Sequence, residues 1–102
     1  MAEKLKKLYK LRVPNEIADL IRNLHPQFKR KVKSALKLII SDPHAGKSLK
    51  ADLKGLSSFK VGRFRIIYRI VSNRVIEIVT IGPRKIIYDE TYIIIRNEAQ
   101  DK

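Results

Sequence analysis

The sequence contains no cysteine and has only two histidines among its 102 residues. The absence of cysteine excludes disulfide bonds and thiolate metal sites, and it is compatible with a reducing compartment. His25 and His44 lie nineteen positions apart with no other ligand at metal-binding spacing, so we interpret each as a solvated loop residue. We therefore expect neither a metal nor a cofactor.

Glycine and acidic residues are also scarce: the chain has four glycines and ten aspartates and glutamates. The glycines do not form the fingerprint of a phosphate-binding P-loop or a dinucleotide-binding fold. Asp89 and Glu90 are adjacent and point in different directions, which makes them a poor pair for two-metal or glycosidase chemistry. Ser57 and Ser58 have no histidine nearby in the sequence. An active site in this chain must therefore be built from arginine, lysine and tyrosine.

Long hydrophobic runs are missing as well. No segment reaches the roughly 18 uninterrupted apolar residues that a membrane span requires. The first ten residues, MAEKLKKLYK, carry charges throughout and lack the apolar centre of a signal peptide. We expect a cytoplasmic protein with no membrane partner, folded as a single domain over residues 1–102.

Positive charge is abundant. The chain has 23 lysines and arginines and a net charge of +13, and both halves of the sequence are basic. Such a charge favours polyanionic partners and makes their association fast and dependent on salt. Charge alone leaves RNA, DNA, an acidic protein and an anionic membrane open as partners.

The first half of the chain predicts one strand and two helices. The segment KLYKLRV alternates imperfectly and ends at Pro14, as a short strand does. Beyond it, Ile17, Leu20, Ile21 and Leu24 recur at helical spacing. A second helix ends at the sequence SDP (41–43). Its apolar stripe consists of Phe28, Val32, Leu36, Ile39 and Ile40.

The second half predicts strands at about 56–61, 63–71 and 75–81, with a compact turn at 72–74 that makes the last two a hairpin. The segment KIIYDETYIIIR then returns as a short strand or helix. The predicted class is α+β, with an N-terminal strand and an antiparallel helix pair packed on one face of a mainly antiparallel sheet of three to four further strands. The opposite face of this sheet is expected to be uncovered.

Strand 63–71 places cations on that open face. Because side chains alternate along a strand, Arg63, Arg65 and Ile67 share one face, and Arg69 follows them. A solvated sheet face that happens to be basic explains this pattern about equally well. Similarly, Arg84 and Tyr88 fit either a functional site or a turn cation and a sheet-edge aromatic.

Arginine, lysine and tyrosine suit one reaction in particular, the cleavage of RNA through its own 2′-hydroxyl. This reaction needs neither a protein nucleophile nor a metal. It needs a group that removes the 2′ proton, cations that neutralise the phosphorane, and an acid for the departing 5′ oxygen. Arginine fits the second task because its planar guanidinium matches phosphate oxygens.

Several segments together resemble the RelE/ParE superfamily of toxins from type II toxin–antitoxin modules. They are VPNEIADLIRNL, the second helix ending in SDP, SLKADLKGLSSFKVGRFRIIYRI, and IGPRKIIY. The phrase KVGRFRIIY is similar to the family pattern R-x-G-x-Y-R-x-x-Y, with Lys60 and Phe64 in place of the usual arginine and tyrosine. The resemblance covers most of the chain and implies a compact fold of helices against an antiparallel sheet.

The resemblance also implies roles for individual residues. Arg65 resembles the strand arginine that holds the scissile phosphate, and Arg84 resembles the late arginine that stabilises the transition state. Tyr88 resembles the tyrosine that stacks on the substrate base or transfers a proton, and Lys60 resembles part of the basic cluster. RelE-type sites offer a second lysine where this chain has Ser58. Either Lys60 or Tyr88 is therefore the general base, or Lys54 or Arg63 replaces the missing lysine. Supporting contacts with RNA are expected from Lys54, Arg63, Arg69 and Lys85.

The RelE branch implies an endoribonuclease that cuts messenger RNA in the ribosomal A site, with a RelB-like antitoxin that blocks it in a heterotetrameric complex. The ParE branch shares the fold and inhibits DNA gyrase without cleaving RNA. The joint presence of an arginine pair and a tyrosine at the matching positions favours the RelE branch. An inactive basic RNA-binding domain is the third reading, because fold does not determine function.

Overall fold

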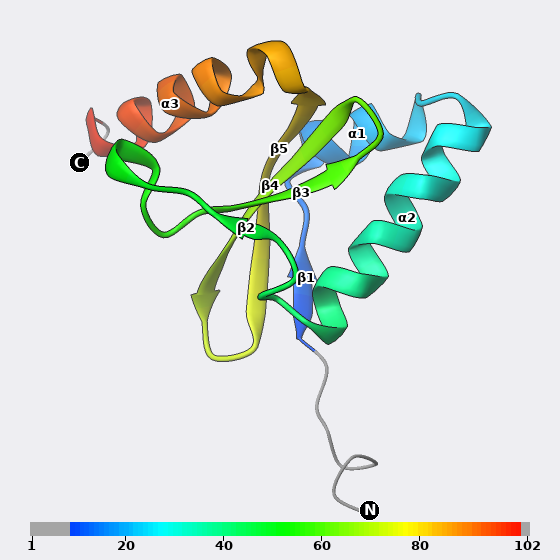
Figure 1. The fold of residues 1–102 in the computed structure, drawn as a ribbon, viewed down its shortest axis with the longest axis horizontal. Helices are drawn as coiled ribbons and strands as arrows, with labels where there is room; N and C mark the ends of the chain where they lie inside the picture. Colours follow the sequence, from blue (N-terminus) through cyan, green and yellow to red (C-terminus); the bar gives the residue numbers. More distant parts are fainter. Residues whose placement is uncertain (1–8, 101–102) are drawn as a thin grey trace, which may run out of the picture.

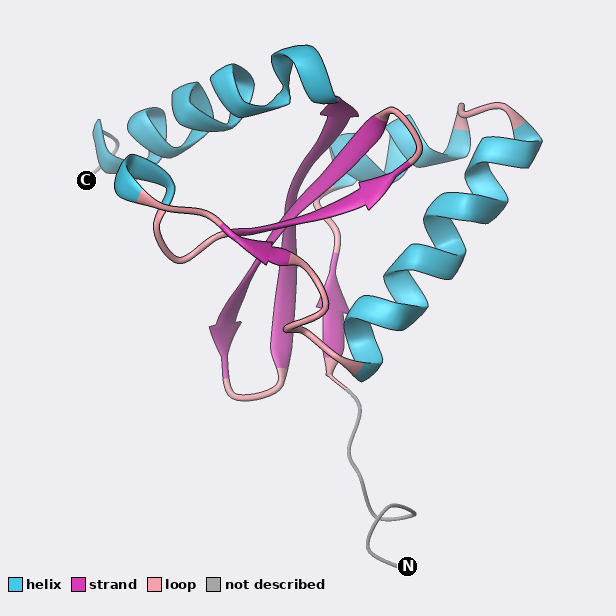
Figure 2. Cartoon of the chain, in the orientation of Figure 1, coloured by secondary structure: helices cyan, strands magenta, loops and turns pink. Residues whose placement is uncertain are grey.

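The structure is a computed structural model that describes residues 9–100. A five-stranded sheet in the order β1-β5-β4-β3-β2 lies between two helical layers (Figures 1 and 2). The short strand β1 (Lys10–Arg12) pairs in parallel with β5, and every other neighbouring pair is antiparallel. The sheet therefore matches the predicted class, with an N-terminal strand and four further strands.

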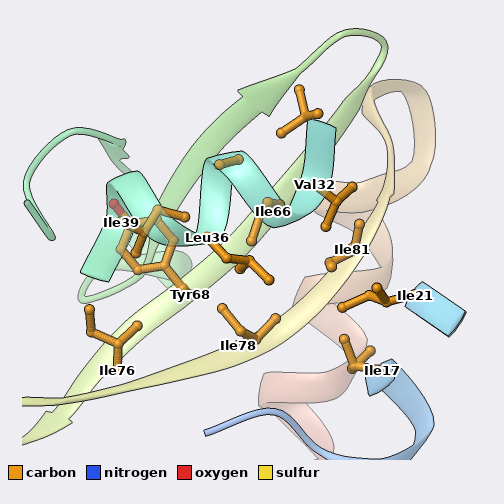
Figure 3. Close-up of a cluster of buried hydrophobic side chains, with 12 residues drawn as sticks. Ile17, Ile21, Val32, Leu36, Ile39, Ile66, Tyr68, Ile76, Ile78 and Ile81 are labelled. Atoms are coloured by element: carbon orange, nitrogen blue, oxygen red, sulfur yellow. The ribbon is translucent and has the colours of Figure 1, made fainter. Parts of the chain in front are cut away.

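One face of the sheet carries the first two helices, α1 (Asn15–Arg22) and α2 (Pro26–Ser41). Pro14 precedes α1, and His25 caps α2 by accepting a hydrogen bond from the backbone N–H of Gln27 at 3.3 Å. Most of the predicted apolar stripe packs inward, because Ile17, Ile21, Val32, Leu36 and Ile39 are all buried (Figure 3). Leu20 was predicted in the stripe of the first helix, but it is exposed at the edge of α1. The prediction of a helix pair on one face is confirmed.

The central hairpin consists of β4 (Phe64–Ser72) and β5 (Val75–Pro83). Ile66 and Tyr68 on β4 pack under α1 and α2, together with Ile76 and Ile78 on β5 (Figure 3). One extra residue, Val79, lies between the pairs Ile67/Thr80 and Tyr68/Ile78, which forms a β-bulge. Two shorter strands, β3 (Ser57–Val61) and β2 (Lys47–Ser48), extend the sheet beyond β4, and the short 3₁₀ helix η2 (Ala51–Leu53) connects them.

The expectation of an uncovered second face is wrong. The last segment forms a helix, α3 (Arg84–Gln100), that lies across this face. Ile87 and Thr91 are fully buried, and Ile94 and Ile95 pack beside them. These positions are spaced by four, three and one, which puts them on one side of a helix and decides between the two predicted alternatives.

The same correction applies to Ile67. Alternation predicted it on an open, basic face, but Ile67 is fully buried with Leu56, Val79 and Ile87. The run Ile66, Ile67, Tyr68 is therefore buried at three consecutive positions, because both faces of β4 are covered there. Charged side chains are therefore left to the ends of this second face.

Candidate functional site

The candidate site lies where the turn between β3 and β4 meets the first turn of α3. Gly62 and Arg63 form that turn, and Gly62 adopts a positive φ of 59°, a conformation that favours glycine. The backbone N–H of Arg84 donates to the carbonyl of Arg63 at 2.9 Å. This bond attaches the start of α3 to the turn, so that Arg63 and Arg84 are held near one another.

Three neighbouring strands supply the floor of the site. Lys60 on β3 lies opposite Arg65 on β4, and Arg65 lies opposite Gly82 on β5. Partners directly opposite in an antiparallel pair project from the same face, so Lys60 and Arg65 lie side by side on the α3 face. Gly82 has no side chain there, and a Cβ atom would come within 2.9 Å of the Cδ1 of Ile87. Its absence allows α3 to approach the sheet closely.

Two adjoining hollows open at this end of the sheet, with volumes of about 800 and 400 Å³. Four residues line both hollows, namely Lys60, Arg65, Arg84 and Tyr88. They are the four residues predicted as catalytic. We call the two hollows together the basic groove.

The basic groove is strongly electropositive. Arg63 and Lys85, both predicted to contact RNA, complete the cationic lining of the larger hollow, and Lys47 joins the smaller one. No carboxylate lines either hollow in the described part of the chain. The first N–H groups of α3 add their partial positive charge at the same place. Such a groove attracts phosphate groups. The carboxylate of Glu90 approaches its floor, with Oε1 3.5 Å from the position that a Cβ of Gly82 would take.

Arg65 is half-buried and oriented by its own turn. Its Nη1 donates to the carbonyl of Phe64 at 3.0 Å and, more weakly, to that of Gly62 at 3.4 Å. Because a guanidinium has five N–H donors, the remaining donors are available to a phosphate. The contact with the turn thus orients the Arg65 guanidinium and uses only its Nη1 as a donor.

Tyr88 is half-buried and packs against the small apolar cluster beneath α3. Its hydroxyl lies 3.2 Å from the hydroxyl oxygen of Ser58, at hydrogen-bond distance. The ring is therefore held by apolar contacts while its polar end reaches the smaller hollow. This arrangement suits either stacking on a base or transfer of a proton.

Two predicted RNA contacts lie outside the basic groove. Arg69 donates to Glu77 at 2.8 and 2.9 Å and to Glu98 at 3.0 and 3.1 Å, so it joins β4, β5 and the far end of α3. These carboxylates raise the pKa of Arg69, with the hydrogen bond to Glu98 contributing most and burial opposing it. Lys54 is exposed and lines a separate hollow between η2 and the loop after α2. Their predicted roles stay predictions, and neither residue lines the basic groove.

Sequence reasoning missed Lys47 and the contact of Ser58 with Tyr88. The strand that contains Lys47 has only two residues, which is too short to show alternation in the sequence. Ser58 and Lys60 are two apart on β3 and so share a face, a signal that was present in the sequence. Within residues 9–100, no group of three or more His, Asp or Glu side chains could hold a metal ion, and no helix is long and apolar enough to span a membrane.

Comparison with solved structures shows the fold. The chain is similar to a RelE toxin from E. coli, an arginine double mutant in the free state, with 18% identity and a TM-score of 0.70 over 90% of this chain and 98% of the other. It is also similar to a chain of the RelBE2 toxin–antitoxin complex from Mycobacterium tuberculosis, with 25% identity and a TM-score of 0.66 over 76% and 100%. A YoeB/ParE toxin from Agrobacterium tumefaciens gives 20% identity and a TM-score of 0.62 over 74% and 98%.

A search of curated protein sequences finds no significant match. The family model described as ParE toxin of type II toxin–antitoxin system, parDE, matches residues 3–88, which is most of the chain. Sequence and fold thus agree with the resemblance seen in the separate motifs. The chain belongs to the ParE toxin family of type II toxin–antitoxin systems, within the RelE/ParE superfamily.

Proposed function

We propose that this toxin is an endoribonuclease that cleaves messenger RNA in the ribosomal A site and so inhibits translation. The observation that carries the proposal is the convergence of Lys60, Arg65, Arg84 and Tyr88, from three different elements, on one groove with a cationic lining. Cleavage through the RNA's own 2′-hydroxyl can be catalysed by these side-chain types and needs no metal. A gyrase inhibitor has no need to gather them at one place.

The proposed step is an in-line transfer within the RNA. The 2′ oxygen forms a bond to phosphorus while the bond from phosphorus to the 5′ oxygen breaks, which leaves a 2′,3′-cyclic phosphate and a free 5′-hydroxyl. Either Lys60 or Tyr88 accepts the 2′ proton, and the other of the two donates a proton to the departing 5′ oxygen. Arg65 holds the scissile phosphate, and Arg84 stabilises the charge that develops on it.

The ribosome is the proposed site of action because the charge of the chain suits it. A net charge of +13 favours ribosomal RNA as a docking surface and predicts association that weakens as salt rises. The ribosome would also hold the message in a geometry ready for attack, which lowers the barrier by orientation. We accordingly place the toxin in the cytoplasm.

The proposed partner is a RelB-like antitoxin with acidic and apolar helical segments. Support comes from similar solved structures, which include RelE–RelB complexes from Pyrococcus horikoshii and E. coli. An acidic segment over the basic groove would neutralise it, and the encounter would be fast at low salt. We propose a heterotetramer of two toxins and two antitoxins, which co-purification and light scattering test directly.

The decisive experiment incubates the purified toxin with programmed ribosomes and maps the RNA ends. Cleavage within the A-site codon, unchanged by EDTA, supports the proposal. Intact message, under conditions where a known ribosome-dependent nuclease cuts, contradicts it.

Gyrase inhibition is the second candidate, and the match to the ParE family model favours it. In that case α1, α2 and the exposed side of α3 would carry the contact with gyrase. Accumulation of cleaved plasmid in the presence of gyrase and toxin would support this candidate. Unchanged plasmid supercoiling at high toxin concentration would count against it.

A further inference from the structure

The smaller hollow of the basic groove contains a lysine that no sequence pattern indicated. Lys47 on β2 lies directly opposite Ser58 on β3, and both residues line this hollow together with Tyr88 and Arg84. Cross-strand partners project from the same face, so Lys47 reaches the side of the sheet on which Lys60 and Arg65 lie. The resemblance implied a second lysine on β3 at the position of Ser58. The neighbouring strand β2 supplies a lysine beside that position.

The backbone on both sides of Lys47 is held in place. Before it, the N–H of Gly46 donates to the hydroxyl of Tyr68 at 3.1 Å, and this hydroxyl donates to the carbonyl of Pro43 at 2.7 Å. After it, the N–H of Leu49 donates to the carbonyl of Leu56 at 2.9 Å. Tyr68 is only 1% exposed, so the anchor belongs to the core. Lys47 thus has an ordered backbone and an exposed side chain, which suits binding of a mobile charged ligand.

Ser58 completes the arrangement. It is 6% exposed, and its hydroxyl lies 3.2 Å from that of Tyr88, so a small polar side chain sits between Lys47 and the tyrosine. A buried hydroxyl needs a hydrogen-bond partner, and Tyr88 is the partner that Ser58 has. The contact restricts the position of the Tyr88 hydroxyl within the hollow.

We infer that Lys47 binds a phosphate of the RNA within the cleavage site and that Ser58 is a positioning residue for Tyr88. The inference rests on the proposed function for its catalytic consequence, but phosphate binding by Lys47 can be measured without cleavage. The ligand recognised is a phosphodiester of a single-stranded RNA.

The test of Lys47 compares Lys47→Met with Lys50→Met. Lys50 is an exposed lysine three positions away that lines a different hollow, so the pair matches the loss of charge but not the place. At saturating ribosome concentration, we expect Lys47→Met to cleave about tenfold or more slowly than wild type. Lys50→Met should stay within about twofold, because solvated charges outside the site are screened.

The second measurement is binding of a non-cleavable 2′-O-methyl trinucleotide at several salt concentrations. Loss of one phosphate contact should lower the slope of log affinity against log salt by about 0.7 for Lys47→Met, and Lys50→Met should keep the wild-type slope. Equal rates and equal slopes for the two variants would overturn the assignment of Lys47. A slope difference without any cleavage by wild type would retain Lys47 as a phosphate ligand and refute the nuclease. A wild-type protein that neither binds nor cleaves contradicts both.

The test of Ser58 is a double-mutant cycle with Tyr88. Ser58→Ala should slow cleavage severalfold in the wild-type background and have no further effect in the Tyr88→Phe background, because the two hydroxyls act as one unit. Ser48→Ala, which removes an exposed hydroxyl from β2 outside the basic groove, is the matched control and should change neither rate. Independent, additive effects of the Ser58 and Tyr88 substitutions would show that Ser58 does not act through Tyr88.

Discussion

The two faces of the sheet differ in size and in chemistry. Beneath α1 and α2 lies the larger cluster, whose buried members are aliphatic except for Tyr68 and against which Phe28, Phe59 and Phe64 also pack. Beneath α3 the cluster is small, and charged side chains lie at both of its ends, the basic groove at one and Arg69 with its carboxylates at the other. The first face supplies most of the hydrophobic stabilisation, so the second can carry closely spaced cations that repel one another.

The largest effect should come from the first face. Ile66→Ala removes a fully buried side chain and should lower the free energy of unfolding by about 2 to 5 kcal/mol, because it leaves a cavity. Ile86→Ala on α3 is the control, since Ile86 is 47% exposed and its loss should change stability little. Denaturant titration measures both. Equal losses of unfolding free energy for the two variants would contradict the claim that the first face supplies most of the hydrophobic stabilisation.

Arg84→Ala, on the second face, should reduce the rate of cleavage and leave the stability of the fold almost unchanged. We expect cleavage to slow by about 10² to 10³, equivalent to about 2.7 to 4 kcal/mol of transition-state stabilisation, while stability stays close to wild type. Arg96→Ala removes an exposed arginine from the other end of the same helix and serves as the control. Wild-type rates for Arg84→Ala in single-turnover assays would remove Arg84 from the mechanism.

Tyr68→Phe tests the residue that anchors the segment before β2 to the core of the first face. Its hydroxyl bonds Pro43 and Gly46 in the segment that leads to Lys47. Losing it leaves buried partners unsatisfied and should cost about 1 to 3 kcal/mol of stability. If cleavage also slows, the anchor positions Lys47 as well as the core. Phe59→Leu, a change in the same core without a polar group, should alter stability without altering the salt dependence of RNA binding.

Tyr68 also predicts a pH dependence. Burial raises the pKa of Tyr68 above its ordinary value of 10. Above pH 10 the unfolded chain therefore releases this proton more readily than the folded one, so stability falls as pH rises through the folded pKa. Tyr68→Phe should lose less stability than wild type between neutral pH and pH 11 when both are measured by denaturant titration. Identical losses would mean that other groups account for the alkaline effect.

The smallest effect should come from Glu98→Gln. Arg69 keeps its bonds to Glu77, and Glu98 is 47% exposed, so the loss should be about 0.2 to 1 kcal/mol and should shrink at high salt. Thermal denaturation at low and high salt measures it. A loss as large as that of Ile66→Ala would show that this ion-pair network, and not apolar packing, holds α3 on the sheet.

Local patterns predicted much of the fold. The periodic spacing of Ile17 and Ile21 and the compact turn after Ser72 correspond to α1 and the central hairpin. Alternation failed at Ile67, because it assumes that only one face is buried, and only the packing of α3 shows that both are. Periodicity can identify a strand, but it does not reveal what covers the strand.

In the candidate site too, local motifs identified some residues, and long-range strand pairing placed another. Arg65, Arg84 and Tyr88 were accessible to sequence reasoning because they lie in motifs, and the structure brings them to one groove. Lys47 was not, because its place depends on the pairing of a two-residue strand with β3. A side chain that joins a site through such long-range pairing leaves no periodic trace in the sequence.

The carboxylate pair around Arg69 has a consequence beyond holding α3. Arg69 and Arg12 offset the charges of Glu77 and Glu98, so the end of the α3 face opposite the basic groove is close to neutral while the groove end is cationic. This single face therefore carries an uneven charge along its length. In the field of a polyanion such a molecule experiences a torque that turns its cationic end forward. The toxin would then approach a nucleic acid, or an acidic antitoxin, already oriented before the first contact forms.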